Sequence, residues 1–322
     1  MNILHKTLVA GGLAMSAVCT ASAAEDWPQK PIRLVVPFAP GGSTDVTARL
    51  VADKLTAELE QQVAVDNVPG AGGMVGAAEV AAAPADGYTV LFGTSTMSTL
   101  QVFFKEPSVD TLKDFIPTSL VSQGVTSLIV NQQVRVNSVA EFIEKARINP
   151  ASISFGTPGQ GTASLTMEMM KHRAGLEVEV VHYRGAGPAM TALLSNEIQA
   201  MFEPTLTAKP VVDGGQAKVL ATTGLERSPV FPDAPTLTEA LGEKFDGSFY
   251  NGVFLKAGTS DVIVQKLQSA VKTVVDLPDV KQKLTELGQI PVGSSPEAFR
   301  QKLEAEIPQW IGVGKVAGVE PH

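Results

Sequence analysis

Eight short apolar runs rich in β-branched residues recur along the chain, and each has the length and composition of a β-strand. They occupy residues 32–38, 63–67, 88–93, 127–131, 152–156, 178–183, 218–223 and 251–257. The segments between them place apolar residues three to five positions apart, as at Val46, Leu50, Val51, Leu55 and Leu59, which is typical of an amphipathic helix. Alternating strands and helices predict an α/β protein with parallel sheets, which bind ligands at the carboxyl ends of their strands.

The last part of the chain changes to a helical pattern. Helices are predicted over residues 261–275, 278–287 and 296–313, with Pro278 suited to a first helical turn and Gly288 to a helix end. We expect this tail to pack back on one of the two sheet-forming halves.

The N-terminal segment has the features of a cleaved signal peptide. Residues 1–23 contain a Lys, a short apolar run from Leu8 to Val18 and the triplet Ala21-Ser22-Ala23, which indicate secretion to the periplasm rather than a membrane span. Cleavage after Ala23 leaves 299 of the 322 residues, removes the one Cys and changes the net charge from −8 to −9 through loss of Lys6. This acidic balance argues against a nucleic-acid partner, and we expect a monomer.

Four predicted strand ends carry glycine and hydroxyl residues directly before a predicted helix. These turns read VVPFAPGGSTD (35–45), GTSTMST (93–99), GTPGQGTAS (156–164) and YRGAGPA (183–189). A helix N-terminus exposes N–H groups and partial positive charge, so an anion is the natural guest of such turns. Glycine and capping residues also serve strand-to-helix loops for structural reasons alone.

Motifs for catalysis, nucleotides and metals are weak. GTPGQGT has Thr162 where a phosphate loop has Lys, GAGGMVG (70–76) has Val75 where a dinucleotide fingerprint has its third glycine, and no G-x-S-x-G occurs. His172, His182 and His322 lack metal-ligand spacing. We therefore expect no catalytic residue, no metal and no cofactor. An exported enzyme that uses Ser95, Asp45 or Glu203 on a carboxylate is the alternative.

From Trp27 onward the chain resembles the Bug-type solute receptors of tripartite tricarboxylate transporters. The resemblance rests on six stretches: WPQKPIRLVVPFAPGGSTDVTARLVADKL, DNVPGAGGMVGAAEVAAAPADGYTVLFGTSTMS, FGTPGQGT, VHYRGAGPAMTALLSNEIQAMF, RSPVFPDAPTLTEA and EIPQWIGVGKVAGV. It implies a two-lobed periplasmic binding protein fold of type II-like architecture, in which each lobe is a mainly parallel sheet flanked by helices. The lobes would close on a small carboxylate, and the closed form would deliver it to a membrane permease.

The resemblance also implies lobe boundaries and a binding site. The chain would cross between lobes near Gln123 and Phe249, so that residues 24–124 and 247–322 form the first lobe and residues 125–246 the second. The ligand carboxylate would be held by backbone groups on two opposed turns, with further contacts from neighbouring loops. The implied ligand-binding residues are Phe38, Ala39, Pro40, Gly41, Gly42, Ser43, Thr44, Asp45, Thr94, Ser95, Gly159, Gly161, Thr162, Ala163, Ser164, Arg184, Gly185 and Glu203.

Two departures from the family pattern concern the site: Leu165 stands where many relatives have His, and Val68 where they often have Arg. Glu203 occupies a position that varies with the ligand, and an acid there accepts an ammonium or hydroxyl group or faces water. Dicarboxylates, tricarboxylates, aromatic acids and amino acids all share the carboxylate that the turns would hold. A receptor that signals through a sensor protein instead of serving uptake is a further alternative.

Overall fold

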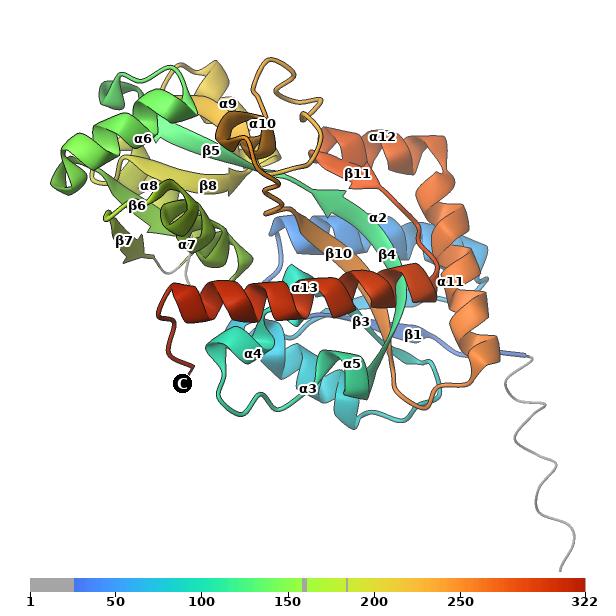
Figure 1. Ribbon diagram of the computed structural model, residues 1–322. Coiled ribbons are helices and arrows are strands. Elements are labelled where there is room, and N and C mark those ends of the chain that lie inside the picture. The colour runs from blue at the N-terminus through green and yellow to red at the C-terminus, as the bar shows by residue number, and fades with distance from the viewer. Residues whose placement is uncertain (1–25, 158–160, 184, 322) are drawn as a thin grey trace, which may run out of the picture.

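The computed structural model describes residues 26–157, 161–183 and 185–321, and the predicted signal peptide lies outside this range. In this part of the chain the strands form two sheets, each flanked by helices, as Figure 1 shows. The two-lobed α/β fold expected from the sequence is confirmed. We call the parts built on the first and second sheets the first and second lobe.

The first sheet combines strands from both ends of the chain. Its order is β11-β4-β10-β3-β1-β2. The strands are β1 (Ile32–Val36), β2 (Val63–Asn67), β3 (Thr89–Thr94), β4 (Phe115–Gly124), β10 (Phe249–Lys256) and β11 (Gln289–Pro291). Strand β1 is parallel to β2 and β3, whereas β10 runs antiparallel to both β3 and β4.

The second sheet repeats this arrangement. Its order is β7-β6-β8-β5-β9. The strands are β5 (Thr126–Asn131), β6 (Ser154–Thr157), β7 (Glu179–His182), β8 (Ala200–Pro204) and β9 (Ala217–Thr222). Strand β6 is parallel to β7 and β8, and β5 runs antiparallel to β8 and β9.

Both sheets are mixed, but most strands of each run in one direction, as expected: β10 and β11 oppose the others in the first sheet, and β5 opposes the others in the second. The antiparallel strands β5 and β10 are those that begin where the chain arrives from the other lobe. They start at the edge where β8 and β3 end, because Thr126 pairs with Pro204 and Asn251 pairs with Thr94. A strand that enters a sheet from this edge must run against its neighbours.

Helices cover both faces of each sheet. On the first sheet, β1 alternates its side chains: Leu34 and Val36 join one apolar cluster with α2 and α11, whereas Val35 joins another with α3. The second sheet packs α6 and α7 on one face and α8 and α9 on the other. The helices are α2 (Ser43–Glu58), α3 (Met74–Ala82), α4 (Leu100–Phe103), α5 (Thr111–Asp114), α6 (Val139–Ile148), α7 (Thr162–Ala174), α8 (Ala186–Leu194), α9 (Thr205–Asp213), α10 (Leu237–Leu241), α11 (Asp261–Asp276), α12 (Pro278–Glu286) and α13 (Pro296–Val316), with 3₁₀ turns η1 (Ala71–Gly73), η2 (Ser95–Ser98), η3 (Gln132–Val134) and η4 (Pro150–Ser152).

The last helix packs on both lobes, so the prediction that the tail packs on one half was wrong. Phe299 and Leu303 lie in an apolar cluster of the first lobe, whereas Trp310 lies in the main cluster of the second. Figure 1 shows α13 running along both lobes. A helix of 21 residues is about 30 Å long, the diameter of a small domain, which allows it to reach across both lobes.

No helix in the described part of the chain combines the length and hydropathy that a membrane crossing requires.

Candidate ligand-binding site

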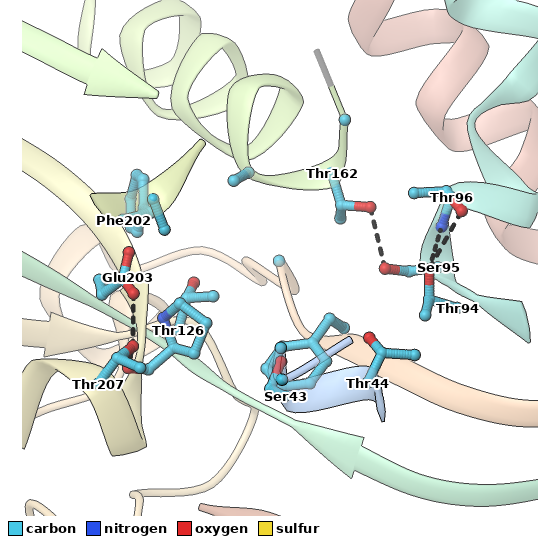
Figure 2. Close-up of a pocket in the computed structure, with 18 residues that line it drawn as sticks. Ser43, Thr44, Thr94, Ser95, Thr96, Thr126, Thr162, Phe202, Glu203 and Thr207 are labelled. Carbon is cyan, nitrogen blue, oxygen red and sulfur yellow. Dashed lines mark hydrogen bonds between the residues drawn. The ribbon is translucent and has the colours of Figure 1, made fainter. Parts of the chain in front are cut away.

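A cavity of about 470 Å³ lies between the lobes. Its walls come from the ends of β3 and β8, from the first residues of β5 and β10, and from the first turns of α2, α7, α8 and α9, as the close-up in Figure 2 shows in part. This size falls within the range of small-molecule sites. The carboxyl ends of the strands thus meet at the cavity, as expected for an α/β ligand site.

The first turn of α2 presents N–H groups to the cavity. Gly42 occupies the N-cap position in extended conformation, and no side-chain oxygen caps the helix. The initial N–H groups have no acceptor within a helix, and a glycine cap has no side chain to supply one. The preceding Gly41 has φ of +86°, a left-handed conformation that favours glycine and turns the chain into the helix.

Asp45 holds this turn from behind instead of lining the cavity. It is 3 % exposed, and its carboxylate accepts hydrogen bonds from the Gly41 N–H at 2.9 Å, from Arg49 Nε at 3.0 Å and from Asn67 Nδ2 at 2.9 Å. Burial would raise the pKa of Asp45, but these hydrogen bonds, led by that from Arg49, lower it overall. The carboxylate therefore stays ionised and fixes the turn.

Two helices of the second lobe begin at the same cavity with glycine caps. Gly161 precedes α7 and Gly185 precedes α8, and neither helix has a side-chain cap. At α7 the Ser164 hydroxyl accepts from the Gly161 N–H at 3.1 Å and donates to the Gly161 carbonyl at 2.8 Å. This pair fixes the cap residue and leaves the helix N-terminus directed at the cavity, which Ala186 of α8 also lines.

A hydroxyl-rich turn after β3 contacts α7 across the cavity. Thr162 Oγ1 donates a hydrogen bond to Ser95 Oγ at 3.0 Å, and both side chains are buried. Beside it, the Thr94 and Thr96 hydroxyls lie 3.1 Å apart. Figure 2 shows this group together on one side of the cavity. The observed partner of Ser95 is thus a threonine, not a basic residue that would activate a nucleophile.

Glu203 lies at another side of the cavity, on β8. It is 2 % exposed. Thr207 donates to its Oε1, and its Oε2 is buried without a hydrogen-bond partner among the described residues. Burial raises the pKa of Glu203 to about 7, although the Thr207 hydrogen bond lowers it in part. The side chain therefore changes its charge near neutral pH.

The residues expected at the site fall into three groups. Ten line the cavity: Gly41, Gly42, Ser43, Thr44, Thr94, Ser95, Gly161, Thr162, Ala163 and Glu203. The cavity lining does not include the described residues Phe38, Ala39, Pro40, Asp45, Ser164 and Gly185. Gly159 and Arg184 lie outside the described residues.

Eight residues that line the cavity were not predicted from the sequence. They are Thr96, Thr126, Ala186, Phe202, Pro204, Thr207, Gly247 and Phe249. Thr96 and Ala186 lie within the predicted turns 93–99 and 183–189 but were not among the residues expected to contact the ligand. The other six reach the cavity only through the order of the strands, which no local pattern of residues predicts.

Metal binding has no support in the described range, where no three His, Cys, Asp or Glu side chains gather in a way that could hold an ion. The chemistry of the cavity is instead that of backbone donors, hydroxyls and one carboxyl among the described lining residues. Such a site binds and orients a small polar molecule.

Two lobes around a cavity of this kind define the class of solute-binding proteins. Residues 47–313 match the model of the tripartite tricarboxylate transporter family receptor, and the chain belongs to this family.

Relatives and solved structures agree with this assignment over nearly the whole chain. The chain is 30 % identical to protein BugT of Bordetella pertussis over 324 residues, which cover 99 % of each chain. It is similar to a structure of an R. palustris protein with adipate, with a TM-score of 0.83, 32 % identity and coverage of 92 % of this chain and 100 % of that one. MatC from Rhodopseudomonas palustris with bound malate gives a TM-score of 0.78, 29 % identity and coverage of 89 % and 100 %.

Proposed function

We propose that this protein is a periplasmic receptor that binds a small carboxylate between its lobes and delivers it to the membrane permease of a tripartite transporter. The observation that carries the proposal is the convergence of three glycine-capped helix N-termini, those of α2, α7 and α8, on one cavity. Similar proteins hold adipate and malate, which supports a carboxylate as the guest.

The proposal includes the export and division of the chain. Residues 1–23 act as the signal peptide, and the mature monomer consists of a first lobe from residues 24–124 and 247–322 and a second lobe from 125–246. Strand β4 ends at Gly124 in the first sheet and β5 begins at Thr126 in the second. This direct succession supports a crossing point there.

The binding mode assigns the carboxylate to the backbone. Its oxygens accept from the first N–H groups of α2 and from those of α7 in the opposite lobe. Hydrogen bonds to charged groups contribute about 1.5–3 kcal/mol each, and a helix N-terminus adds up to about 2 kcal/mol. Four such bonds sum to about 6–12 kcal/mol, a range that includes the roughly 8 kcal/mol of micromolar affinity before ordering costs are subtracted.

The substitution Gly42→Asp tests this mode while preserving the fold. Gly42 already has the extended conformation of an N-cap residue, and an added Cβ meets only the Ala39 carbonyl at 3.8 Å. Asp is a preferred N-cap, so its carboxylate occupies the N–H groups that the ligand would use. We expect an unchanged or higher melting temperature and a loss of carboxylate affinity of at least about 100-fold, given the magnitudes of such bonds.

Gly312→Asp is the matched control, because it adds the same charge on α13 where an added Cβ has open space. Thermal-shift and calorimetric titrations of the ligand-stripped mature protein against a panel of carboxylates measure both effects. Full affinity in Gly42→Asp would show that α2 does not hold the carboxylate. A wild-type protein that binds no member of the panel would overturn the receptor proposal itself.

A further inference from the structure

Glu203 is held firmly in the cavity wall, but only one of its two carboxyl oxygens has a hydrogen-bond partner among the described residues. Its strand β8 is hydrogen-bonded between β5 and β6, and Ser127 is its partner across the ladder. The carboxyl group is held at one oxygen by Thr207, while the other oxygen has no partner in the described part of the chain. A buried polar atom without a partner costs free energy, so a donor is expected at this point in the bound state.

No basic side chain among the described residues forms an ion pair with this carboxyl group. Among the described lining residues, Glu203 is the one ionisable side chain. The elements packed on β8 are β5, β6, α7, α8 and α9. Several ionisable side chains of these elements form ion pairs, but none of these pairs includes Glu203. These pairs are Lys209 with Asp213, Lys171 with Glu168 and Arg173 with Glu243, and His172 lies near the end of α7.

The cavity therefore has two regions of opposite character. The N-termini of α2 and α7 favour an anion, whereas Glu203 presents an acidic oxygen. Figure 2 shows Glu203 and Thr207 on the side away from Ser95, Thr96 and Thr162. A ligand with two carboxylates would place its second charge against a carboxyl group, but a ligand with a carboxylate and a cation would satisfy both regions.

We propose that the ligand is an amino acid or similar zwitterion, whose carboxylate is held at the helix N-termini and whose ammonium group donates to Glu203 Oε2. This inference rests on the proposed carboxylate receptor and names the ligand class of that site. Phe202 and Phe249 line the same cavity, and Glu203 itself is 2 % exposed, so little water reaches this contact. The exclusion of water strengthens a paired charge and penalises an unpaired one.

The proposal predicts whether the protein releases or takes up protons when the ligand binds, and this direction can be measured. Because burial raises the pKa of Glu203 to about 7, roughly half of the free protein carries a proton there at pH 7. An ammonium group favours the carboxylate and expels this proton, so binding should release up to about half a proton. A second ligand carboxylate would instead favour the protonated form and take a proton up.

The experiment is calorimetric titration at pH 7 in two buffers of different ionisation enthalpy, with matched ligand pairs. Adipate and ε-aminohexanoate form one pair, since they differ only in the distal group; α-amino acids and the corresponding acids without the amine form others. We expect the amine member of at least one pair to bind more tightly and to release protons. Tighter binding of the diacids with proton uptake, or amine binding without proton exchange, would overturn the proposal.

Variants then assign the effect to this side chain. Glu203→Gln keeps the shape of the side chain and removes its charge, and it should weaken binding of the amine ligand about 10- to 100-fold and abolish the proton release. The exposed Glu179 on β7 gives the control Glu179→Gln, which should change neither. Equal losses for amine and diacid ligands in Glu203→Gln would contradict a specific ammonium contact. Failure of every pair to bind would instead refute the receptor function on which the inference rests.

Discussion

The Thr162 hydroxyl of the second lobe donates a hydrogen bond to Ser95 Oγ of the first lobe at 3.0 Å. The two residues are 67 positions apart and both are buried. Since each lies at the start of a turn that borders the cavity, the bond forms only while the lobes are together. It therefore links the lobe arrangement to the two surfaces that would hold a ligand.

Ser95→Ala and Thr162→Val should each weaken ligand binding by removing this contact from the closed arrangement. A neutral hydrogen bond contributes about 0.5–1.5 kcal/mol, so we expect a 2- to 10-fold loss of affinity, mainly through faster dissociation, in stopped-flow or surface-binding kinetics. Thr191→Val is the control, because the Thr191 hydroxyl bonds to Gly187 within α8. Unchanged dissociation rates in both cavity variants would show that the contact does not support closure.

Asp45→Asn should destabilise the protein in a pH-dependent way. Asn has one acceptor oxygen, so a donor among Gly41, Arg49 and Asn67 would face an NH₂ group, at a cost of about 1–3 kcal/mol. The pKa of Asp45 is lowered in the folded protein, so its stabilisation is present above the ordinary Asp value of about 3.9 and is lost as pH falls through the folded value. In urea unfolding, the free energy of unfolding of the variant should lie well below that of wild type at pH 7, and the difference should be smaller at pH 3.

The matched control for this prediction is Asp53→Asn, on the exposed side of the same helix. It removes the same charge without disturbing the turn, so its effect should stay within about 0.5 kcal/mol. If Asp45→Asn were no more destabilising than this control at pH 7, the carboxylate would not be what fixes the turn at Gly41.

Glu203 should make the ligand-free protein less stable as pH rises. Its pKa is raised from 4.5 to about 7, so the folded state binds more protons than the unfolded state between these values. The free energy of unfolding then falls over this interval by up to about 3 kcal/mol. Glu203→Gln lacks this dependence and should match wild type near pH 4.5 but exceed its melting temperature at pH 8. Parallel melting curves at both pH values would contradict a raised pKa.

The sequence predicted the strands that are rich in apolar β-branched residues, such as residues 32–38 and 88–93, but not β4, β8 or β11. Strand β4 reads FIPTSLVSQG, and two of its buried hydroxyls are satisfied by distant residues: Ser119 donates to the Ser294 carbonyl, and Ser122 to Gln289. Strand β8 is short and carries Glu203 and Pro204. Hydropathy along the chain cannot reveal a polar strand whose partners lie far away in sequence.

The residues of the site likewise divide into those that the sequence predicts and those that it does not. Gly42 and Thr162 were predictable because glycine and hydroxyl residues at strand ends have a local physical meaning. Phe249 and Thr207 were not predictable, since their side chains reach the cavity only because β10, and β8 with the helix α9 that follows it, lie at particular positions in the fold. Local chemistry is encoded in short segments, whereas the composition of a wall depends on the order of the strands.

Gly124 marks the point where the chain leaves the first sheet, and its lack of a side chain accommodates Phe249. The two residues pair across β4 and β10, and a Cβ on Gly124 would overlap the Phe249 ring. Gly124→Ala should therefore displace this ring, which lines the cavity. Overpacking costs about 1–3 kcal/mol, so we expect a lower free energy of unfolding together with weaker ligand binding.

A double-mutant cycle isolates the steric cause. If the ring is what the added methyl meets, Gly124→Ala should cost little in a Phe249→Ala background, and the coupling energy should be about 1 kcal/mol or more. Gly312→Ala is the control for the exchange itself, because it lies in open space on α13 and should stabilise the helix slightly. Additive costs at Gly124 and Phe249 would mean that the methyl acts on the backbone at the crossing point and not through the aromatic wall of the cavity.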